Sequence, residues 1–255
     1  MGVTDLSFHR TTASLVSNVL KTMGFEVERI FSPHQENFEK LKAGEIDMLS
    51  SAWLPSSHGI YKSDVEKVEP LIELGLHYEP YALWGVPDYV PEEMVAEVAD
   101  LLKPEVVEQM RPKIQGINPE AGITRFSIQM MEEYGLSKAG YGIFTGSEDD
   151  CFSAFEDAVA NKEWVIVPLW KPGVCYYRYD IRELIEPKGL LGIVDRAVLL
   201  LRDDKKNLFT DEQLKTLDSL RFSNDIIAEL DYKVCRFGKP QDEVMYEWLA
   251  AQGVI

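Results

Sequence analysis

The sequence predicts an α/β fold, and three observations lead to this prediction. Short apolar segments alternate with longer amphipathic ones from the first residues onward, which is typical of strands that alternate with helices in a largely parallel sheet. Gly or Pro closes many of these segments, as turn residues do. The 255 residues, 45% apolar and 27% charged, also provide enough chain for one large domain or two medium ones.

The first third of the chain predicts strands and helices in turn. Apolar residues recur at helical spacing between Leu15 and Met23, so we expect a helix there. Thr11 or Thr12 can cap its start, and Gly24 stops it. The other elements show alternation or helical spacing and end at Gly or Pro: strands at 4–8, 25–31 and 46–53, and a helix at 36–42.

The remaining elements follow the same logic. Residues 164–170 read WVIVPLW, an almost wholly apolar run that predicts a buried strand. Pro87, Pro91 and Pro104 punctuate a region that resembles a crossing between domains. We expect extended segments at 71–75, 81–86 and 197–202, and helices at 118–134, 149–160, 211–220, 223–230 and 241–251.

The charge balance argues against several partner classes. Asp and Glu number 43 against 26 Lys and Arg, a net charge of −17, which repels nucleic acid and anionic lipid. Apolar runs fall short of the roughly 20 residues that a membrane-spanning helix needs. We therefore expect no nucleic-acid partner and no membrane insertion. The first residues lack the basic and apolar regions of a secretory signal, so we expect either a cytoplasmic protein or one whose signal segment is absent from this chain.

Cysteine, histidine and catalytic motifs give no support for a metal site or an enzyme. The three cysteines are widely spaced, and the four histidines show no metal-binding spacing. No nucleophile, phosphate-binding or dinucleotide-binding motif is present. We therefore assign no catalytic residue, no metal ligand and no cofactor.

Two tryptophans stand in similar surroundings, Trp53 in SAWLP and Trp170 in PLWKP. Each ends an apolar strand and precedes a proline by two residues. In open α/β sheets ligands bind at this end of the strands. The pair therefore indicates a binding site with aromatic faces, although either ring can equally be core packing.

The chain resembles, over nearly its whole length, the substrate-binding proteins of ABC transporters for glycine betaine, proline and related quaternary ammonium solutes. The resemblance rests on motifs that occur in the family's order. They are GEID at 44–47 with AWLPSSHG at 52–59, WGVPDYV at 84–90, NPEAGITR at 118–125, LWKP at 169–172, YD at 179–180 and EPKG at 186–189.

This resemblance implies a two-lobed periplasmic-binding-protein-like fold of type II with the ligand cleft between the lobes. One lobe would contain residues 1–84 plus 200–255 and the other residues 85–199, with hinge strands near 82–86 and 197–201. The resemblance also implies a membrane-embedded permease as partner, a periplasmic or extracytoplasmic location, and no cofactor.

The family holds its cationic ligand in a box of aromatic side chains, and residue-by-residue transfer places Trp53 and Trp170 in it. Aromatic faces suit this ligand because a quaternary ammonium has no N–H to donate, and each contact is worth roughly 0.5–2 kcal/mol. Tyr176 and Tyr177 are further candidates for the box, but alternation along a strand prevents neighbours from facing it together.

The chain departs from the family at two places. Pro172-Gly173-Val174 replaces PHW, so a histidine and a tryptophan that the family uses are missing. In the first loop, Phe8-His9-Arg10-Thr11-Thr12 replaces a segment such as NWAEA. If the ligand has a carboxylate, its candidate donors are His9, Arg10, Thr11 and Thr12 with the helix N–H groups behind them, and the backbone of Gly173 and Val174.

Two other readings stay open. One is an enzyme on the same scaffold that acts on a small amine or amino acid, with His9 as base and Arg10 as carboxylate clamp. The other is a sensor domain that reports ligand occupancy. An enzyme should require a pair of titratable groups within hydrogen-bond reach, and His9 alone is a natural candidate in the expected cleft, so the sequence favours binding.

Overall fold

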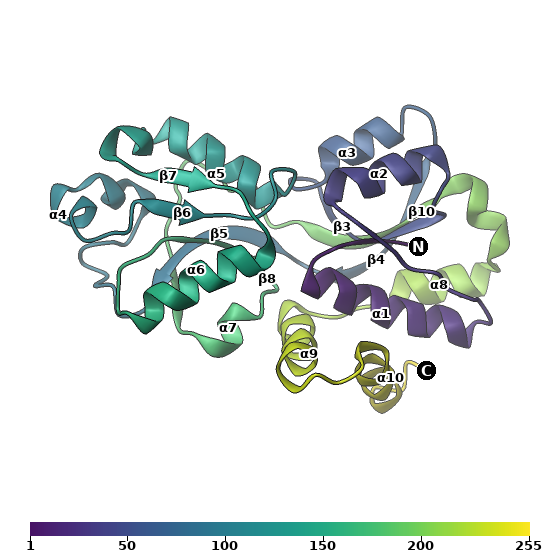
Figure 1. The fold of residues 1–255 in the computed structure, drawn as a ribbon. Helices are drawn as coiled ribbons and strands as arrows, with labels where there is room; N and C mark the ends of the chain where they lie inside the picture. The colour runs from purple at the N-terminus through teal and green to yellow at the C-terminus, as the bar shows by residue number, and fades with distance from the viewer. The chain divides into compact units, whose positions relative to one another are not determined.

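The structure is a computed structural model that describes residues 1–255 apart from the side chains of Tyr177 and Arg236. The chain divides into two compact units, shown in Figure 1. Unit 1 contains residues 1–80 and 195–255, and unit 2 contains residues 81–194. The chain therefore passes between units at Pro80–Tyr81 and at Val194–Asp195, a few residues before the boundaries proposed from the sequence.

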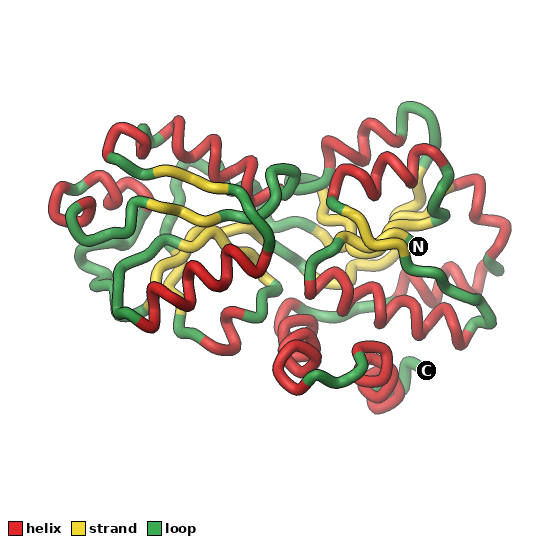
Figure 2. The backbone as a smooth tube through the Cα atoms, in the orientation of Figure 1, coloured by secondary structure: helices red, strands yellow, loops and turns green.

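Unit 1 is built on one mixed sheet whose strand order is β2-β1-β3-β10-β4 (Figure 2). Strand β1 lies parallel to β2 and β3, whereas β10 runs antiparallel to both β3 and β4. The strands are β1 (Gly2–Thr4), β2 (Ile30–Ser32), β3 (Met48–Leu54), β4 (Leu71–Tyr78) and β10 (Arg196–Arg202). Because the first and last parts of the chain share this sheet, unit 1 needs both.

Helices cover both faces of the unit 1 sheet (Figure 1). Helices α2 and α3 lie over one face and α1 and α8 over the other, while α9 and α10 pack against α1. They are α1 (Ser7–Thr22), α2 (His34–Ala43), α3 (Gly59–Val65), the 3₁₀ helix η3 (Asp203–Leu208), α8 (Asp211–Ser219), α9 (Asn224–Phe237) and α10 (Gln241–Ala251). Gly44 ends α2 at φ 75°, a left-handed conformation that glycine adopts without strain.

Unit 2 contains two small sheets. Strand β5 pairs antiparallel with β8 and β9, and β6 pairs parallel with β7. The strands are β5 (Tyr81–Pro87), β6 (Lys113–Gln115), β7 (Gly142–Phe144), β8 (Val167–Lys171) and β9 (Ile181–Glu183). The helices are η1 (Val98–Leu102), α4 (Pro104–Val107), α5 (Gly122–Glu133), η2 (Leu136–Ala139), α6 (Glu148–Ala160) and α7 (Cys175–Arg178). Among the described residues, no helix combines the length and apolarity that crossing a membrane requires.

Three sequence predictions about local structure are wrong. Residues 4–8 are not one strand, because β1 ends at Thr4 and α1 begins at Ser7. The strand predicted at 25–31 shortens to β2, since the Phe25 ring packs on Phe209, with centroids 4.7 Å apart, outside the sheet. The third error concerns the largely parallel sheet: the unit 1 sheet is mixed because β10 enters it in the reverse direction, and β5 pairs antiparallel with β8 and β9 in unit 2.

The predicted hinge strands correspond to β5 and β10. Strand β5 begins directly after the first crossing and pairs within unit 2. Strand β10 begins one residue after the second crossing and pairs within unit 1. Each strand therefore leads from a crossing into the sheet of one unit.

Candidate functional site

Trp53 lies near the carboxyl end of β3, and only 7% of it is exposed. Its ring centroid is 5.1 Å from that of Phe8 and 5.3 Å from that of His9, both on α1. The indole N–H donates to the Tyr78 hydroxyl at 3.1 Å. Burial raises the pKa of Tyr78, so this hydroxyl keeps its proton and holds the indole in one orientation.

A second hydroxyl completes this arrangement. Ser51 and Tyr78 share a hydrogen bond of 2.5 Å between their hydroxyl groups. Ser51 has φ 59°, a left-handed conformation that is uncommon for serine, two residues before Trp53. The position of Trp53 therefore depends on local backbone geometry as well as on packing.

The loop after β3, residues 55–58, is anchored by the side chain of Asp195 and by that of its own residue His58. The carboxylate of Asp195 accepts hydrogen bonds from the backbone N–H groups of Ser56, at 2.6 Å, and Ser57, at 3.0 Å. His58 Nδ1 accepts the backbone N–H of Trp53 at 2.9 Å. This segment, called the Trp53 loop below, therefore has little freedom of its own.

Three histidines that are far apart in the sequence meet beside Trp53. His9, His34 and His58 are all buried, and one ring nitrogen of each lies within 4.8 Å of the others. Sequence reasoning missed this cluster because the residues come from α1, α2 and the start of α3 and show no spacing pattern. Burial first, and the charge of His34 second, lower the pKa of His9 well below its usual value, so His9 is neutral near pH 7.

The tautomer of His58 disfavours metal binding by this cluster. Because Nδ1 of His58 accepts a backbone N–H, the neutral ring carries its proton on Nε2. A metal ligand must present a lone pair. With this tautomer, the Nε2 atom of His58 presents an N–H donor to its neighbours and no lone pair.

We expect the free energy of unfolding to fall as the pH drops from 7 to 5. Burial, with a smaller effect of Arg221, lowers the pKa of the fully buried His77 to about 4. Its unfolded pKa is about 6.5, so the unfolded state takes up a proton over this range while the folded state does not. The expected loss from His77 is about 2 kcal/mol, and His9 acts in the same direction.

Urea unfolding at the two pH values measures this loss. The variant His77→Gln has no imidazole to titrate, so the difference between pH 7 and pH 5 should shrink in it. An unchanged difference in this variant would contradict the assignment to His77.

The residues expected to form a first binding loop belong to α1 instead. His9, Arg10, Thr11 and Thr12 lie in the first two turns of this helix, because it begins at Ser7. The prediction that Thr11 or Thr12 caps the helix is therefore wrong. The Thr11 hydroxyl donates to Asp231 at 3.2 Å, and that of Thr12 donates to the carbonyl of Phe8 at 3.0 Å.

Arg10 and His9 differ in their surroundings. Arg10 forms an ion pair with Asp5, and the side chain of each is 48% exposed. His9 is 1% exposed, and its Nδ1 has no hydrogen-bond partner among the described residues. Of the four candidates on α1, His9 is therefore the one buried against Trp53.

Trp170 lies near the end of β8 in unit 2 and is 2% exposed. Its ring stacks on Phe152 of α6, with centroids 5.9 Å apart and planes inclined by 30°. The two tryptophans therefore belong to different units, and each adjoins an aromatic ring of a neighbouring helix.

Gly173 and Val174 connect β8 to the short helix α7. A Cβ atom on Gly173 would lie 2.7 Å from the carbonyl oxygen of Trp170, closer than real Cβ contacts. This position therefore cannot hold the histidine that the family pattern has there without a backbone shift. Tyr177 lies in α7, and its side chain is outside the described part of the structure.

Tyr176 is paired with a lysine that sequence reasoning missed. The ammonium of Lys171 lies 4.6 Å from the centroid of the Tyr176 ring and 2.8 Å from a carboxylate oxygen of Glu183. The same ammonium lies 5.6 Å from the centroid of the Tyr81 ring. An internal cation therefore already contacts the ring of Tyr176, which the sequence proposed for the ligand box.

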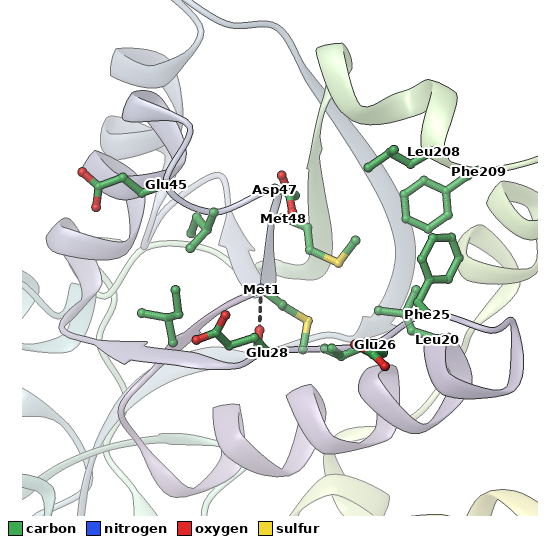
Figure 3. A pocket seen from close by; sticks show the side chains of 13 residues that line it. Met1, Leu20, Phe25, Glu26, Glu28, Glu45, Asp47, Met48, Leu208 and Phe209 are labelled. Carbon is green, nitrogen blue, oxygen red and sulfur yellow. Dashed lines mark hydrogen bonds between the residues drawn. The ribbon is translucent and has the colours of Figure 1, made fainter.

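A separate cavity of about 280 Å³ lies at the opposite end of the unit 1 strands (Figure 3). Met1 and Met48, at the amino ends of β1 and β3, contribute to its floor, and the Met1 amino group donates to the carbonyl of Glu28 at 2.8 Å. Glu26, Glu45 and other carboxylates line it as well. Ligands of α/β sheets bind at the carboxyl ends of strands, so this cavity is not the site indicated by the tryptophans.

Comparison with known proteins gives similarities to transport proteins. The chain is 22% identical over 151 residues to the glycine betaine/carnitine transport binding protein GbuC of Listeria monocytogenes serotype 1/2a (strain 10403S), covering 58% of this chain and 48% of GbuC. The chain thus aligns with about half the length of this curated relative.

Two solved structures share the fold over almost the whole chain. The lactococcal OpuAC crystal structure, closed and complexed with glycine betaine, has a TM-score of 0.85 and 20% identity and covers 99% of this chain and 94% of its own. The ProX glycine betaine, L-proline-binding protein from Borrelia burgdorferi has a TM-score of 0.83 and 26% identity, with coverages of 98% and 92%. They confirm the predicted α/β two-lobed fold of substrate-binding proteins.

The family comparison agrees with these structures. Residues 1–251 match the model for OpuAC, described as the substrate binding domain of the ABC-type glycine betaine transport system. The match includes both units, both tryptophans and the crossings between them. The chain therefore belongs to the OpuAC family of substrate-binding domains of ABC-type glycine betaine transport systems.

Proposed function

We propose that this chain captures a small methylated ammonium solute, such as glycine betaine, proline betaine, carnitine or choline, in an aromatic box contributed by both units. The observation that carries the proposal is the placement of Trp53 and Trp170, each near the carboxyl end of a strand and each in a different unit. A box divided in this way is complete only when the units close on the ligand, which couples capture to closure.

The surroundings of Trp53 support a cation site. Phe8 adds a second aromatic ring, and the Tyr78 hydroxyl fixes the indole by accepting its N–H. Side chains that are already ordered lose little conformational entropy when a ligand binds, and this favours binding. Neutral His9 beside the box does not repel a cation.

For a ligand with a carboxylate, we propose that His9 and the N-terminal turn of α1 receive it. Leu6 provides no side-chain cap to α1, and the positive end of the helix dipole favours an anion there. Thr11 and Thr12 are engaged within unit 1, and Arg10 is held by Asp5, so Arg10 contributes through its charge. The backbone of Gly173 and Val174 is the corresponding candidate in unit 2.

We propose that the chain binds its ligand without transforming it, works with a membrane-embedded permease and acts outside the cytoplasm. Membership of a transport family supports these three statements. The enzyme hypothesis needs an acid–base pair, and His9, with its lowered pKa, contacts the rings of Phe8 and His34 and no carboxylate among the described contacts.

A thermal-shift screen of methylated amines, amino acids and sugars tests the ligand class. A ligand at a hundredfold excess over its Kd stabilises the folded state by about 2.7 kcal/mol, so we expect glycine betaine or choline to raise the Tm. A rise with sugars alone, or with none of these compounds, would refute the quaternary ammonium assignment.

Arg10→Ala distinguishes a zwitterion site from a plain cation site. If the ligand is a betaine, we expect its affinity to fall up to about fivefold, since an exposed charge contributes about 1 kcal/mol or less. A choline site should keep or gain affinity. Calorimetric titrations measure both, with Lys42→Ala as control because Lys42 also forms a surface ion pair in unit 1, with Asp64.

A further inference from the structure

Asp195 begins the last segment of unit 1, directly after the second crossing of the chain. It is 2% exposed, and both of its carboxylate oxygens are used. One accepts the N–H of Ser56 and the other that of Ser57, so the Asp195 side chain binds the backbone of the Trp53 loop. Hydrogen bonds to a charged acceptor are stronger than those to a neutral one, and the Asp195 carboxylate is almost fully buried.

The backbone of Asp195 reaches the other crossing. Its N–H donates to the carbonyl of Pro80 at 2.7 Å, and Pro80 is the last residue before the chain enters unit 2. Two residues earlier, Tyr78 accepts the indole N–H of Trp53. One residue therefore connects the loop behind the proposed ligand contact with both places where the chain leaves or re-enters unit 1.

We propose that Asp195 is a positioning residue that couples the Trp53 loop to the two crossings, so that a ligand held by Trp53 biases the hinge. Without the carboxylate, the N–H groups of half-buried Ser56 and buried Ser57 lose their acceptor, and the loop can move independently of the crossings. The coupling itself follows from these bonds, and only its effect on ligand-driven closure rests on the proposed function.

Hydrogen exchange of the ligand-free protein tests the coupling. In Asp195→Asn the amide has one acceptor oxygen and places an N–H₂ group against a backbone N–H. We expect exchange to rise tenfold or more in the Trp53 loop and also at both crossings, in peptides covering 78–83 and 193–198. Faster exchange in the loop alone would show that Asp195 stabilises only the loop, and it would overturn the proposal.

Asp203 provides a matched control at the other end of β10. The backbone N–H of Asp203 also donates to a proline carbonyl, that of Pro70 at 3.0 Å, but Asp203 is exposed whereas Asp195 is buried. Asp203→Asn should leave exchange at the crossings unchanged. If Asp195→Asn fails to fold, exchange in the wild type decides. The backbone N–H groups of Ser57 and Asp195 should then show the same free energy of opening, and unequal values would overturn the coupling.

Small-angle scattering with saturating glycine betaine tests the functional consequence. We expect the wild type and Asp203→Asn to become more compact, and Asp195→Asn to bind at least tenfold more weakly and to compact less even when saturated. Full compaction of the saturated variant would refute the hinge role. If no methylated amine compacts the wild type, the proposed function fails, and the exchange experiment still decides the coupling.

Discussion

Replacing Trp53 or Trp170 with Ala should weaken binding of the preferred methylated ammonium ligand by tenfold or more. A desolvated contact between an ammonium and an indole face is worth up to about 2 kcal/mol, and 1.4 kcal/mol corresponds to a factor of ten in Kd. Isothermal titration calorimetry with glycine betaine and with choline measures the effect on purified variants.

Both tryptophans are buried, so each truncation also lowers stability, and a control must separate the two effects. Trp84 is fully buried in unit 2, and its indole N–H donates to Ser127 at 2.7 Å, as that of Trp53 does to Tyr78. Trp84→Phe should lower the Tm and keep the affinity. Folded Trp53→Ala and Trp170→Ala proteins with wild-type affinity would assign both rings to packing.

Gly173→Ala should have the second large effect, on unit 2. The added methyl would lie 2.7 Å from the backbone oxygen of Trp170, and backbone cannot move aside as a flexible side chain does. We expect a loss of about 1–3 kcal/mol in the free energy of unfolding, together with weaker ligand binding because Trp170 shifts. Chemical denaturation and calorimetry measure the two losses.

Gly116→Ala is the matched control in the same unit. A Cβ atom at Gly116 would meet its nearest neighbour, the carbonyl oxygen of Phe144, at 3.5 Å, an ordinary contact. This variant should change both quantities little. Equal effects of the two substitutions would show that crowding at Trp170 is not the cause.

The sequence predicted the placement of both tryptophans near strand ends, which is a local feature of the chain. Trp53 and Trp170 end apolar strands and precede prolines, and this pattern can be read within a few residues. The histidine cluster and Asp195 could not be predicted in this way. His9, His34 and His58 meet only after three helices pack, and Asp195 lies 139 positions from Ser56.

The errors at the start of the chain have the same origin. Thr11 looked like a cap because threonine suits that position, but its hydroxyl is taken by Asp231, 220 positions away. Residues 25–31 alternate in the sequence like a strand, but Phe25 packs on Phe209 and β2 begins only at Ile30. Periodicity cannot distinguish such packing from pairing in a sheet. Long-range partners decided both outcomes.

The position of β10 between β3 and β4 has a consequence for how the protein is made. During synthesis, β4 leaves the ribosome more than a hundred residues before the strand that links it to the rest of the sheet. Unit 2 is one continuous segment and can fold as it emerges, whereas the unit 1 sheet must wait for residues 196–202. Nascent unit 1 therefore exposes the unpaired edges of β3 and β4 until that point, and such edges can pair with other chains while this one grows.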